Sequence, residues 1–286
     1  MIAIFGPTAV GKTAVAARVA ERLGAVTVSA DALQVYRGLE ILTGARDAAP
    51  GTRLIGILDV TERCTAGAYA RVAHAEIDAA VAAGRRVVVV GGTGLYLRAA
   101  LADLDLRPPP APGVRERVAG AVARRGAAAA HADLAARAPA AAAGIDPHDR
   151  QRVTRALELV ETGAAPPGGD ELWTARTRHR TALFGLTMDR AALSAAIDAR
   201  VDAMVAAGAE AEVRAAAAAG ASPSARQALG FDELLRGDVE AMRARTRRYA
   251  KRQLTWMRKL PGVAVLDVRG RTADDVAAEV LDSAAS

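Results

Sequence analysis

The segment Gly6-Pro7-Thr8-Ala9-Val10-Gly11-Lys12-Thr13 constrains the fold most, because it matches the P-loop pattern G-x-x-x-x-G-K-[ST] at every fixed position. It follows an apolar run at 2–5 and precedes a stretch with helical spacing at 14–23. A strand that enters a glycine-rich turn and opens a helix directs backbone N–H groups and the positive end of a helix dipole at one point. We therefore expect a phosphate group to bind here, with Lys12 adding a positive charge and the Thr13 hydroxyl holding Mg²⁺. An ordinary glycine-rich turn that contains a lysine is the alternative.

Composition narrows the class of protein. The 286 residues are 51% hydrophobic, but no apolar string approaches the length of a membrane span. The first residue leads directly into an apolar run with no room for a signal peptide, so we expect no membrane segment and a cytoplasmic location. Cys64 is the only cysteine, which excludes an internal disulfide and a cysteine-based zinc cluster. The formal net charge of +6 comes mostly from arginine and permits an anionic partner.

Apolar runs along the chain predict a parallel sheet. The run at 85–94 contains four consecutive valines, which is typical of a strand buried on both faces. Other short apolar runs lie at 2–5, 25–29, 54–60, 181–186 and 263–267. Segments with helical spacing separate most of them. This alternation predicts an α/β fold, namely a P-loop NTPase-like core with a parallel sheet flanked by helices.

Candidate site residues follow two of the predicted strands. Asp31 follows the run at 25–29, and strand ends in an open α/β sheet face the ligand crevice, so its carboxylate is expected near the P-loop. Capping of the segment that begins at Ala32 explains this aspartate equally well. The valine strand ends in Gly91-Gly92-Thr93-Gly94, where many ATP-hydrolysing P-loop proteins place an acidic residue that holds Mg²⁺. This weakly indicates that the bound phosphate is not an energy source, although Asp59 could supply such a carboxylate.

The middle of the chain predicts an all-α insertion. Consecutive prolines at 107–113 favour an extended linker, and residues 114–162 are rich in Ala, Arg and Leu without β-branched runs. A second Pro/Gly stretch follows at 166–169. We therefore divide the chain into a first part of the core (1–106), a helical insertion (107–169) and a second part of the core that ends with a basic helix (170–286).

The helix predicted near the C-terminus is strongly basic. Eight cations surround its apolar line, and no acid lies among them: Arg243, Arg245, Arg247, Arg248, Lys251, Arg252, Arg258 and Lys259. A solvated helix face is the usual explanation for a charge run, but like charges on neighbouring turns repel one another. Binding to a phosphate backbone would relieve this repulsion, so we favour nucleic-acid binding.

Several longer motifs now give the chain a family resemblance. They read Gly-Pro-Thr-Ala-x-Gly-Lys-Thr at 6–13, Ser-Ala-Asp-Ala-Leu-Gln-Val-Tyr-Arg-Gly at 29–38, Gly-Gly-Thr-Gly-Leu-Tyr at 91–96, Asp-x-Gln-Arg-Val-x-Arg-Ala-Leu-Glu at 149–158, Gln-Ala-Leu-Gly-Phe at 227–231 and Thr-Arg-Arg-Tyr-Ala-Lys-Arg-Gln-Leu-Thr-Trp at 246–256. In this order they resemble the bacterial type of the tRNA dimethylallyltransferase (isopentenyltransferase) family, over nearly the whole chain.

The resemblance implies an activity and a set of site residues. A dimethylallyl group would pass from dimethylallyl diphosphate to N6 of the adenosine beside the anticodon of tRNA, with Mg²⁺ as cofactor and the protein as a monomer. Asp31 would accept the proton from the amine, and Thr8 would hydrogen-bond the leaving oxygen. The diphosphate would be bound by Gly6, Ala9, Val10, Gly11, Lys12, Thr13, Thr93 and Gly94. The adenosine and the anticodon stem-loop would be contacted by Gln34, Tyr36, Arg37, Gln151, Arg152, Arg245, Arg248, Lys251 and Arg252. The target base would be flipped into a channel between the core and the insertion.

The chain also departs from the family pattern. Leu42-Thr43-Gly44-Ala45-Arg46 replaces the usual Gly-Thr-Ala-Lys-Pro, and Thr52-Arg53 replaces two histidines. Asp232 stands where a basic residue usually contacts the diphosphate, and Arg226 or Arg236 is the expected substitute. Three alternative functions therefore remain. The first is an adenylate isopentenyltransferase that acts on free AMP or ADP, which the Thr52-Arg53 departure favours. The second is a P-loop small-molecule kinase. The third is a tRNA-binding protein whose catalysis Asp232 has disabled.

Overall fold

The computed structural model describes residues 1–164 and 171–285 and divides the chain into two compact units. The core unit comprises Met1–Leu104 and Glu171–Ser286, and the helical unit comprises Asp105–Asp170. The sequence predicts this insertion at 107–169. Its second predicted linker, at 166–169, lies outside the described residues.

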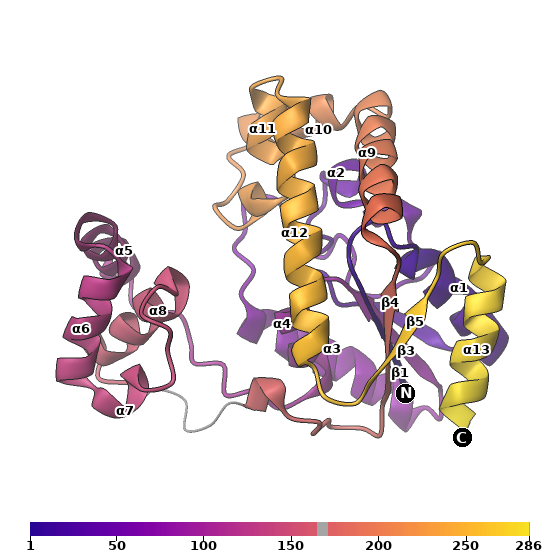
Figure 1. Ribbon diagram of the computed structural model, residues 1–286, viewed down its shortest axis with the longest axis horizontal. Coiled ribbons are helices and arrows are strands. Elements are labelled where there is room, and N and C mark those ends of the chain that lie inside the picture. Colours follow the sequence, from indigo (N-terminus) through magenta and orange to yellow (C-terminus); the bar gives the residue numbers. More distant parts are fainter. Residues whose placement is uncertain (165–170, 286) are drawn as a thin grey trace. The chain divides into compact units, whose positions relative to one another are not determined.

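A five-stranded parallel sheet forms the centre of the core unit (Figure 1). The strands are β1 (Ile2–Phe5), β2 (Val26–Ser29), β3 (Val87–Gly91), β4 (Ala182–Thr187) and β5 (Val263–Asp267). Their order in the sheet is β2-β3-β1-β4-β5, with β1 in the middle between β3 and β4. Because all strands run in the same direction, the loops that follow β1, β2 and β3 meet at one edge of the sheet.

The predicted α/β fold is confirmed, and each of these strands lies within about two residues of an apolar run. The run at 54–60 is the exception, because it forms no strand of the sheet. Within it, Leu58 forms an isolated bridge with Tyr36, and Arg53, just before the run, forms another with Val28 of β2. A non-glycine residue with a positive φ of 66°, Leu54, breaks the extended conformation at its start.

Helices cover both sides of the sheet. Figure 1 shows α1 (Lys12–Leu23) beside α13 (Ala273–Ala285) on one side, and α3 (Ala66–Ala82) beside α4 (Gly94–Leu101) on the other. Apolar side chains of α1 and α13 pack with those of the sheet in one buried cluster that includes Ile4, Val19 and Val276. The remaining elements of the core unit are α2 (Glu40–Thr43), η1 (Ala45–Asp47), η2 (Glu171–Trp173), α9 (Arg190–Ala206), α10 (Ala209–Ala218), η3 (Ala225–Gln227), α11 (Phe231–Leu235) and α12 (Val239–Lys259).

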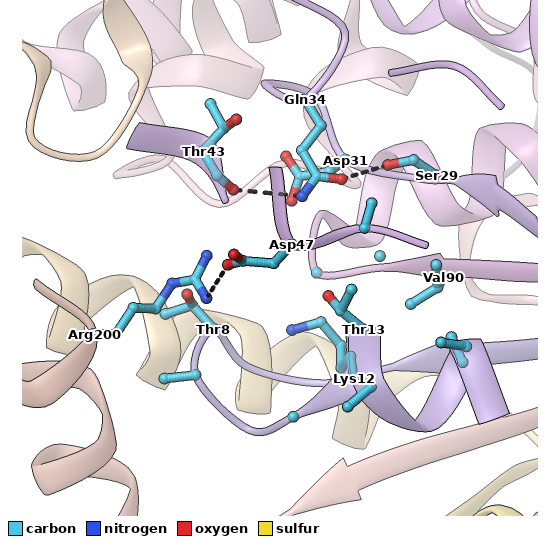
Figure 2. A pocket seen from close by; sticks show the side chains of 18 of the residues that line it. Thr8, Lys12, Thr13, Ser29, Asp31, Gln34, Thr43, Asp47, Val90 and Arg200 are labelled. Carbon is cyan, nitrogen blue, oxygen red and sulfur yellow. Dashed lines mark hydrogen bonds and ion pairs between the residues drawn. The ribbon is translucent and has the colours of Figure 1, made fainter. Parts of the chain in front are cut away.

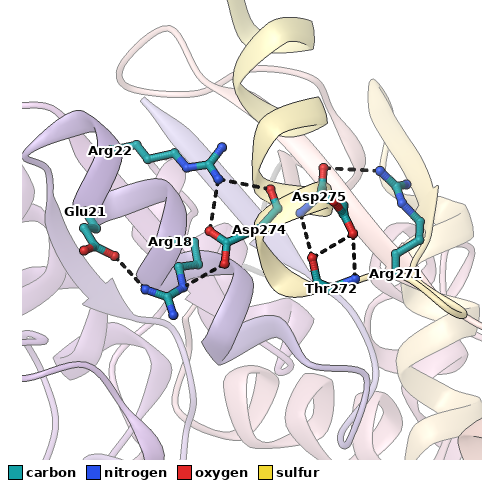
Figure 3. A network of polar contacts seen from close by, with 7 residues as sticks. All are labelled: Arg18, Glu21, Arg22, Arg271, Thr272, Asp274 and Asp275. Carbon is teal, nitrogen blue, oxygen red and sulfur yellow. Dashed lines mark hydrogen bonds and ion pairs between the residues drawn. The ribbon is translucent and has the colours of Figure 1, made fainter.

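Polar contacts join the start of α13 to α1, the helix that the P-loop opens (Figure 3). Asp274 accepts a hydrogen bond of 3.0 Å from Arg22 and forms an ion pair of 3.4 Å with Arg18. Asp275 accepts hydrogen bonds from the backbone N–H and hydroxyl of Thr272, which fixes the start of α13. The C-terminal helix therefore braces the outer side of the phosphate-binding helix.

The helical unit consists of α5 (Val114–Arg125), α6 (Ala127–Arg137), α7 (Pro139–Ala142) and α8 (Arg150–Glu161). Its small core is formed by side chains such as Val122, Leu134 and Val153. Glu158 is buried on α8, where arginines of the same unit neutralise it: its carboxylate lies 3.0 Å from Arg115 and 2.9 Å from Arg155. Within residues 1–164 and 171–285, no helix is long and apolar enough to cross a membrane.

Candidate active site

A cavity of about 790 Å³ opens in the core unit at the carboxyl edge of the sheet. The P-loop forms one side of it, and the segment that follows β2 forms another. Figure 2 shows Lys12 and Thr13 on the P-loop side and Asp31 and Gln34 on the opposite side, with Arg200 reaching in from α9. The cavity therefore collects residues from sequence positions that are far apart.

The P-loop has the conformation that an anion site requires. Gly11 has a left-handed φ of 91° directly before α1, and Ala9 adopts a φ of 66°, which is uncommon for a residue with a side chain. Gly6 allows close packing, because a Cβ there would lie 2.7 Å from the carbonyl oxygen of Leu186. The loop thus holds its backbone N–H groups at the start of a helix, as predicted from the sequence.

Lys12 lies at the cavity with its ammonium folded back on the loop. Its Nζ donates a hydrogen bond of 2.5 Å to the carbonyl oxygen of Pro7. Removal from water lowers the pKa of this ammonium from its usual 10.5 to about 7, while the carboxylate of Asp31 opposes the shift and the charge of Arg200 adds to it. A bound anion would favour the charged form of Lys12, since an opposite charge raises the pKa of a cation.

Asp31 lines the same cavity, and burial raises the pKa of its carboxyl group. The N–H of Leu33, which donates a 3.0 Å hydrogen bond to Oδ1, and the charges of Lys12 and Arg200 act in the opposite direction. Residues 32–35 form turns and no helix, so Asp31 caps a turn and not a helix. A partly buried carboxylate beside two cations can both orient a substrate and accept a proton.

Arg200 is a cavity residue that was not predicted from the sequence. Burial lowers the pKa of its guanidinium, and Nη1 lies 3.7 Å from the carboxylate of Asp47. Gly44 leaves room for it, because a Cβ on that glycine would lie 1.8 Å from Nη2 of Arg200. The available signal was weak: Arg200 falls on the buried face of α9, seven residues after Leu193 and three after Ile197.

The arginines expected to replace the usual basic residue do not line this cavity. Arg226 forms an ion pair of 2.7 Å with Asp232, and both side chains are about two-fifths exposed. Arg236 is exposed on the segment after α11. Neither expected arginine lines the cavity, whose cations besides Lys12 are Arg18 of α1 and Arg200 of α9.

The residues predicted to contact the adenosine have different surroundings. Gln34 lines the cavity and accepts a 2.7 Å hydrogen bond from Ser29. Tyr36 is fully buried, and its hydroxyl donates to Ser224 and accepts from the N–H of Cys64. Arg37 is exposed and does not line the cavity. Of these three predicted contacts, the cavity contains Gln34, while Tyr36 is placed as a core residue.

The second glycine-rich turn packs against α12. Gly91 and Gly92 line the cavity, whereas Thr93 and Gly94 do not. The Thr93 hydroxyl lies 3.2 Å from the hydroxyl of Tyr249 on α12. A Cβ at Gly94 would lie 2.2 Å from the ring of Trp256, which indicates a packing requirement at this glycine. Of this turn, the cavity wall therefore contains Gly91 and Gly92, and the predicted contacts Thr93 and Gly94 pack against α12 instead.

Asp59 does not supply the carboxylate that the sequence analysis allowed for. It is exposed, accepts hydrogen bonds from the N–H and hydroxyl of Thr61, and does not line the cavity. In the described part of the chain, no three acidic, histidine or cysteine side chains are grouped as a metal cluster. Thr13 is on the cavity wall, and a hydroxyl with phosphate oxygens and water is a ligand set that suits Mg²⁺.

The basic helix α12 divides its cations into two groups. Arg243 pairs with Asp202 and Glu240, and Arg247 lies 3.3 Å from Asp198. Five of the cations are exposed and make no ion pair with any residue that the structure describes: Arg248, Lys251, Arg252, Arg258 and Lys259.

Arg245 belongs to the paired group. Both carboxylate oxygens of the nearly buried Glu233, on α11, lie 3.0 Å from its Nη1. Its predicted contact with tRNA stays a prediction, but its charge is already balanced by Glu233. The charge run at 243–259 contains no acid, because its partner acids lie earlier on α12, at Glu240, and on the helices α9 and α11.

The predicted tRNA contacts in the helical unit are on its surface. Gln151 and Arg152 are exposed in the first turn of α8, whose N-cap is Asp149. The Nε of Arg152 lies 3.6 Å from the Asp149 carboxylate. Both side chains are accessible to a partner of the helical unit.

Comparisons with known proteins identify the same family for nearly the whole chain. The sequence model of a family described as "IPP transferase" matches residues 34–260, and one described as "Isopentenyl transferase" matches residues 1–63. A tRNA dimethylallyltransferase from Rhodospirillum rubrum is 43% identical, with 90% of this chain and 85% of the relative covered. One from Anaeromyxobacter sp. (strain K) is 44% identical, with 92% of each covered.

Solved structures give the same result. A tRNA isopentenylpyrophosphate transferase from Bacillus halodurans is 32% identical with a TM-score of 0.71, and the match covers 99% of this chain and 95% of that one. A eukaryotic dimethylallyltransferase acting on tRNA has a TM-score of 0.77 over all of this chain and 79% of that one. At 22% identity, this second likeness shows the fold alone.

Proposed function

This chain belongs to the tRNA dimethylallyltransferase (IPP transferase) family, and we propose that it transfers a dimethylallyl group from dimethylallyl diphosphate to N6 of the adenosine beside the anticodon of tRNA. The observation that carries the proposal is the cavity itself. It combines a P-loop, two partly buried cations and the carboxylate of Asp31, which belongs to no metal cluster of the described residues and supports a proton-accepting role.

Diphosphate is the leaving group in this reaction. The allylic C–O bond breaks, its electron pair stays on the diphosphate oxygen, and negative charge grows there. The P-loop N–H groups, Lys12 and Arg200 stabilise that charge, and the Thr8 hydroxyl donates to the leaving oxygen. Mg²⁺ held through Thr13 would add further positive charge at the diphosphate. No phosphoryl group is transferred, which accords with the glycine turn at the end of β3 in place of an acid.

The acceptor is an exocyclic amine. N6 of adenine attacks the allylic carbon, an N–C bond forms, and the proton lost from N6 passes to the carboxylate of Asp31. The raised pKa of Asp31 makes it a better proton acceptor than an exposed aspartate. Gln34, on the same wall, is positioned to orient the base. The base must leave its stack to reach the cavity.

The same family membership supports tRNA as the partner of this enzyme. The five unpaired cations of α12 provide a phosphate-binding surface for tRNA. Each relative named above is a tRNA-modifying enzyme, which favours tRNA over a free nucleotide as the acceptor. We expect the enzyme to act in the cytoplasm as a monomer.

The test is incubation with labelled dimethylallyl diphosphate and, in separate reactions, unmodified tRNA, AMP and ADP. Label in tRNA alone is the expected result, with release of one diphosphate per group transferred. Label in AMP or ADP would favour the adenylate isopentenyltransferase. ATP hydrolysis at ordinary enzyme rates would favour a kinase or ATPase, and tRNA binding without transfer would indicate that catalysis has been lost.

A further inference from the structure

Gln253 on α12 bridges the two glycine-rich loops of the cavity. Its Oε1 accepts a 2.8 Å hydrogen bond from the backbone N–H of Thr8 in the P-loop, and its Nε2 donates a 2.7 Å hydrogen bond to the carbonyl oxygen of Gly92. The side chain is 4% exposed. We propose that Gln253 is a positioning residue that holds the P-loop in its diphosphate-binding conformation, an inference that rests on the proposed function of this cavity.

The chemistry of the amide matches this place. A buried polar group costs free energy unless it is hydrogen-bonded, and here both ends of one amide have a partner. Gly92 allows the approach, because a Cβ at that position would lie 2.3 Å from Nε2. A carboxylate or a hydrocarbon side chain of equal length could not both accept from Thr8 and donate to Gly92.

The P-loop needs such a restraint from outside. Ala9, next to Thr8, has a φ of 66°, and a residue with a side chain stays in this region only when its surroundings enforce it. The N–H of Thr8 is directed at Gln253 and is therefore already engaged. Gln253 thus fixes the residue before the strained position, while α1 fixes the loop after it.

A ligand-free measurement tests this directly. Hydrogen exchange of the P-loop amides, residues 6–13, is compared in the wild type, Gln253→Met and Gln253→Asn. Methionine has a similar length and no amide, and asparagine keeps the amide but is one methylene too short to reach both loops. Both variants should exchange at the P-loop at least about tenfold faster. Unchanged exchange in either folded variant would overturn the proposal.

The matched control is Met257→Ala, one turn further along the buried side of α12. Met257 packs against Gly185 and does not line the cavity. This variant should lower the melting temperature while P-loop exchange and the KM for dimethylallyl diphosphate stay unchanged. Equal P-loop exchange in Met257→Ala and the Gln253 variants would mean that Gln253 acts only through the packing of α12, which would contradict the inference.

Ligand binding provides the second readout. In both Gln253 variants the dissociation constant of inorganic pyrophosphate and the KM for dimethylallyl diphosphate should rise about five- to thirtyfold, with the KM for tRNA unchanged. An equal rise in both KM values would contradict a role confined to the P-loop. Failure of the proposed function is distinguishable, because it appears as a wild type without transfer activity, whereas the exchange experiment needs no substrate.

Discussion

The two groups of cations on α12 make a quantitative prediction about tRNA binding. Arg248 and Lys251 are exposed and make no ion pair within the described residues, whereas Arg245 and Arg247 pair with Glu233 and Asp198. Two double variants, Arg248→Gln with Lys251→Gln and Arg245→Gln with Arg247→Gln, remove the same charge from the same helix. They should nevertheless affect RNA binding differently.

The expected magnitude follows from counterion release. Each cation that neutralises a phosphate contributes about 0.7–0.9 to the slope of log affinity against log salt. Loss of Arg248 and Lys251 should therefore flatten the slope by about 1.4–1.8. Between about 50 and 200 mM salt, the wild type should then lose about 7- to 12-fold more affinity than this variant.

The paired double variant should behave in the opposite way. Its slope should stay near that of the wild type, because the charges of Arg245 and Arg247 are already neutralised within the protein. Its stability should fall, since Glu233 is nearly buried and an unpaired buried acceptor costs about 1–3 kcal/mol.

Fluorescence anisotropy with a labelled anticodon stem-loop measures the slopes, and thermal unfolding measures the stability of each variant. Equal slopes in the wild type and a well-folded Arg248→Gln/Lys251→Gln variant would refute phosphate binding by this side of α12. Equal flattening in both double variants would refute the division into paired and free cations.

Three further predictions concern the cavity. Asp31→Asn should lower turnover about 10²- to 10⁴-fold and leave tRNA binding unchanged, because the amide cannot accept a proton; near-normal turnover would return Asp31 to a structural role. The kcat/KM for dimethylallyl diphosphate should fall about tenfold per pH unit above pH 7, because the pKa of Lys12 is lowered to about 7 and only its protonated form attracts the diphosphate. Lys12→Arg should move this limb to higher pH, and a limb that does not move would exclude Lys12 as its origin. Arg200→Met should weaken pyrophosphate binding about 10- to 100-fold in calorimetry, because charge-assisted hydrogen bonds are lost, whereas the control Arg226→Met should bind normally; equal affinities in the two variants would contradict the place given to Arg200.

Much of this architecture could be predicted because its signals are local. The P-loop is a contiguous pattern, and the consecutive valines of β3 indicate a strand that is buried on both faces. The place of Asp31 at the cavity could be predicted because it lies just after the end of β2. The basic run on α12 was equally visible in the sequence, but the sequence did not show which of its cations are paired with acids. The acid that neutralises Arg245 lies on α11, so the number of cations left for a phosphate backbone depended on tertiary structure.

The rest of the site depends on contacts between distant residues. Gln253 bonds to Thr8 across 245 positions of sequence, and a glutamine on a helix carries no signal of such a partner. Arg200 reaches the cavity because Gly44, in a different segment, has no Cβ to exclude it. Patterns in a single sequence describe periodicity and spacing along the chain. They do not show which side chain of one helix or loop contacts a distant helix or loop.

The structure also shows that two charged residues among the departures from the family pattern, Asp232 and Arg53, lie outside the cavity lining. Asp232 is paired with Arg226 away from the cavity, so its negative charge is compensated where it stands, while Lys12 and Arg200 line the cavity itself. Arg53, one of the two residues of the departure that favours a free-nucleotide acceptor, is exposed and lies 3.8 Å from Glu76, and its backbone pairs with β2. Because its guanidinium is directed at an acid and is not part of the cavity lining, it supplies no charge that a free nucleotide could use. Of the Thr52-Arg53 departure only Thr52 lines the cavity, so it adds no charge there, whereas the exposed cations of α12 make no ion pair in the described chain.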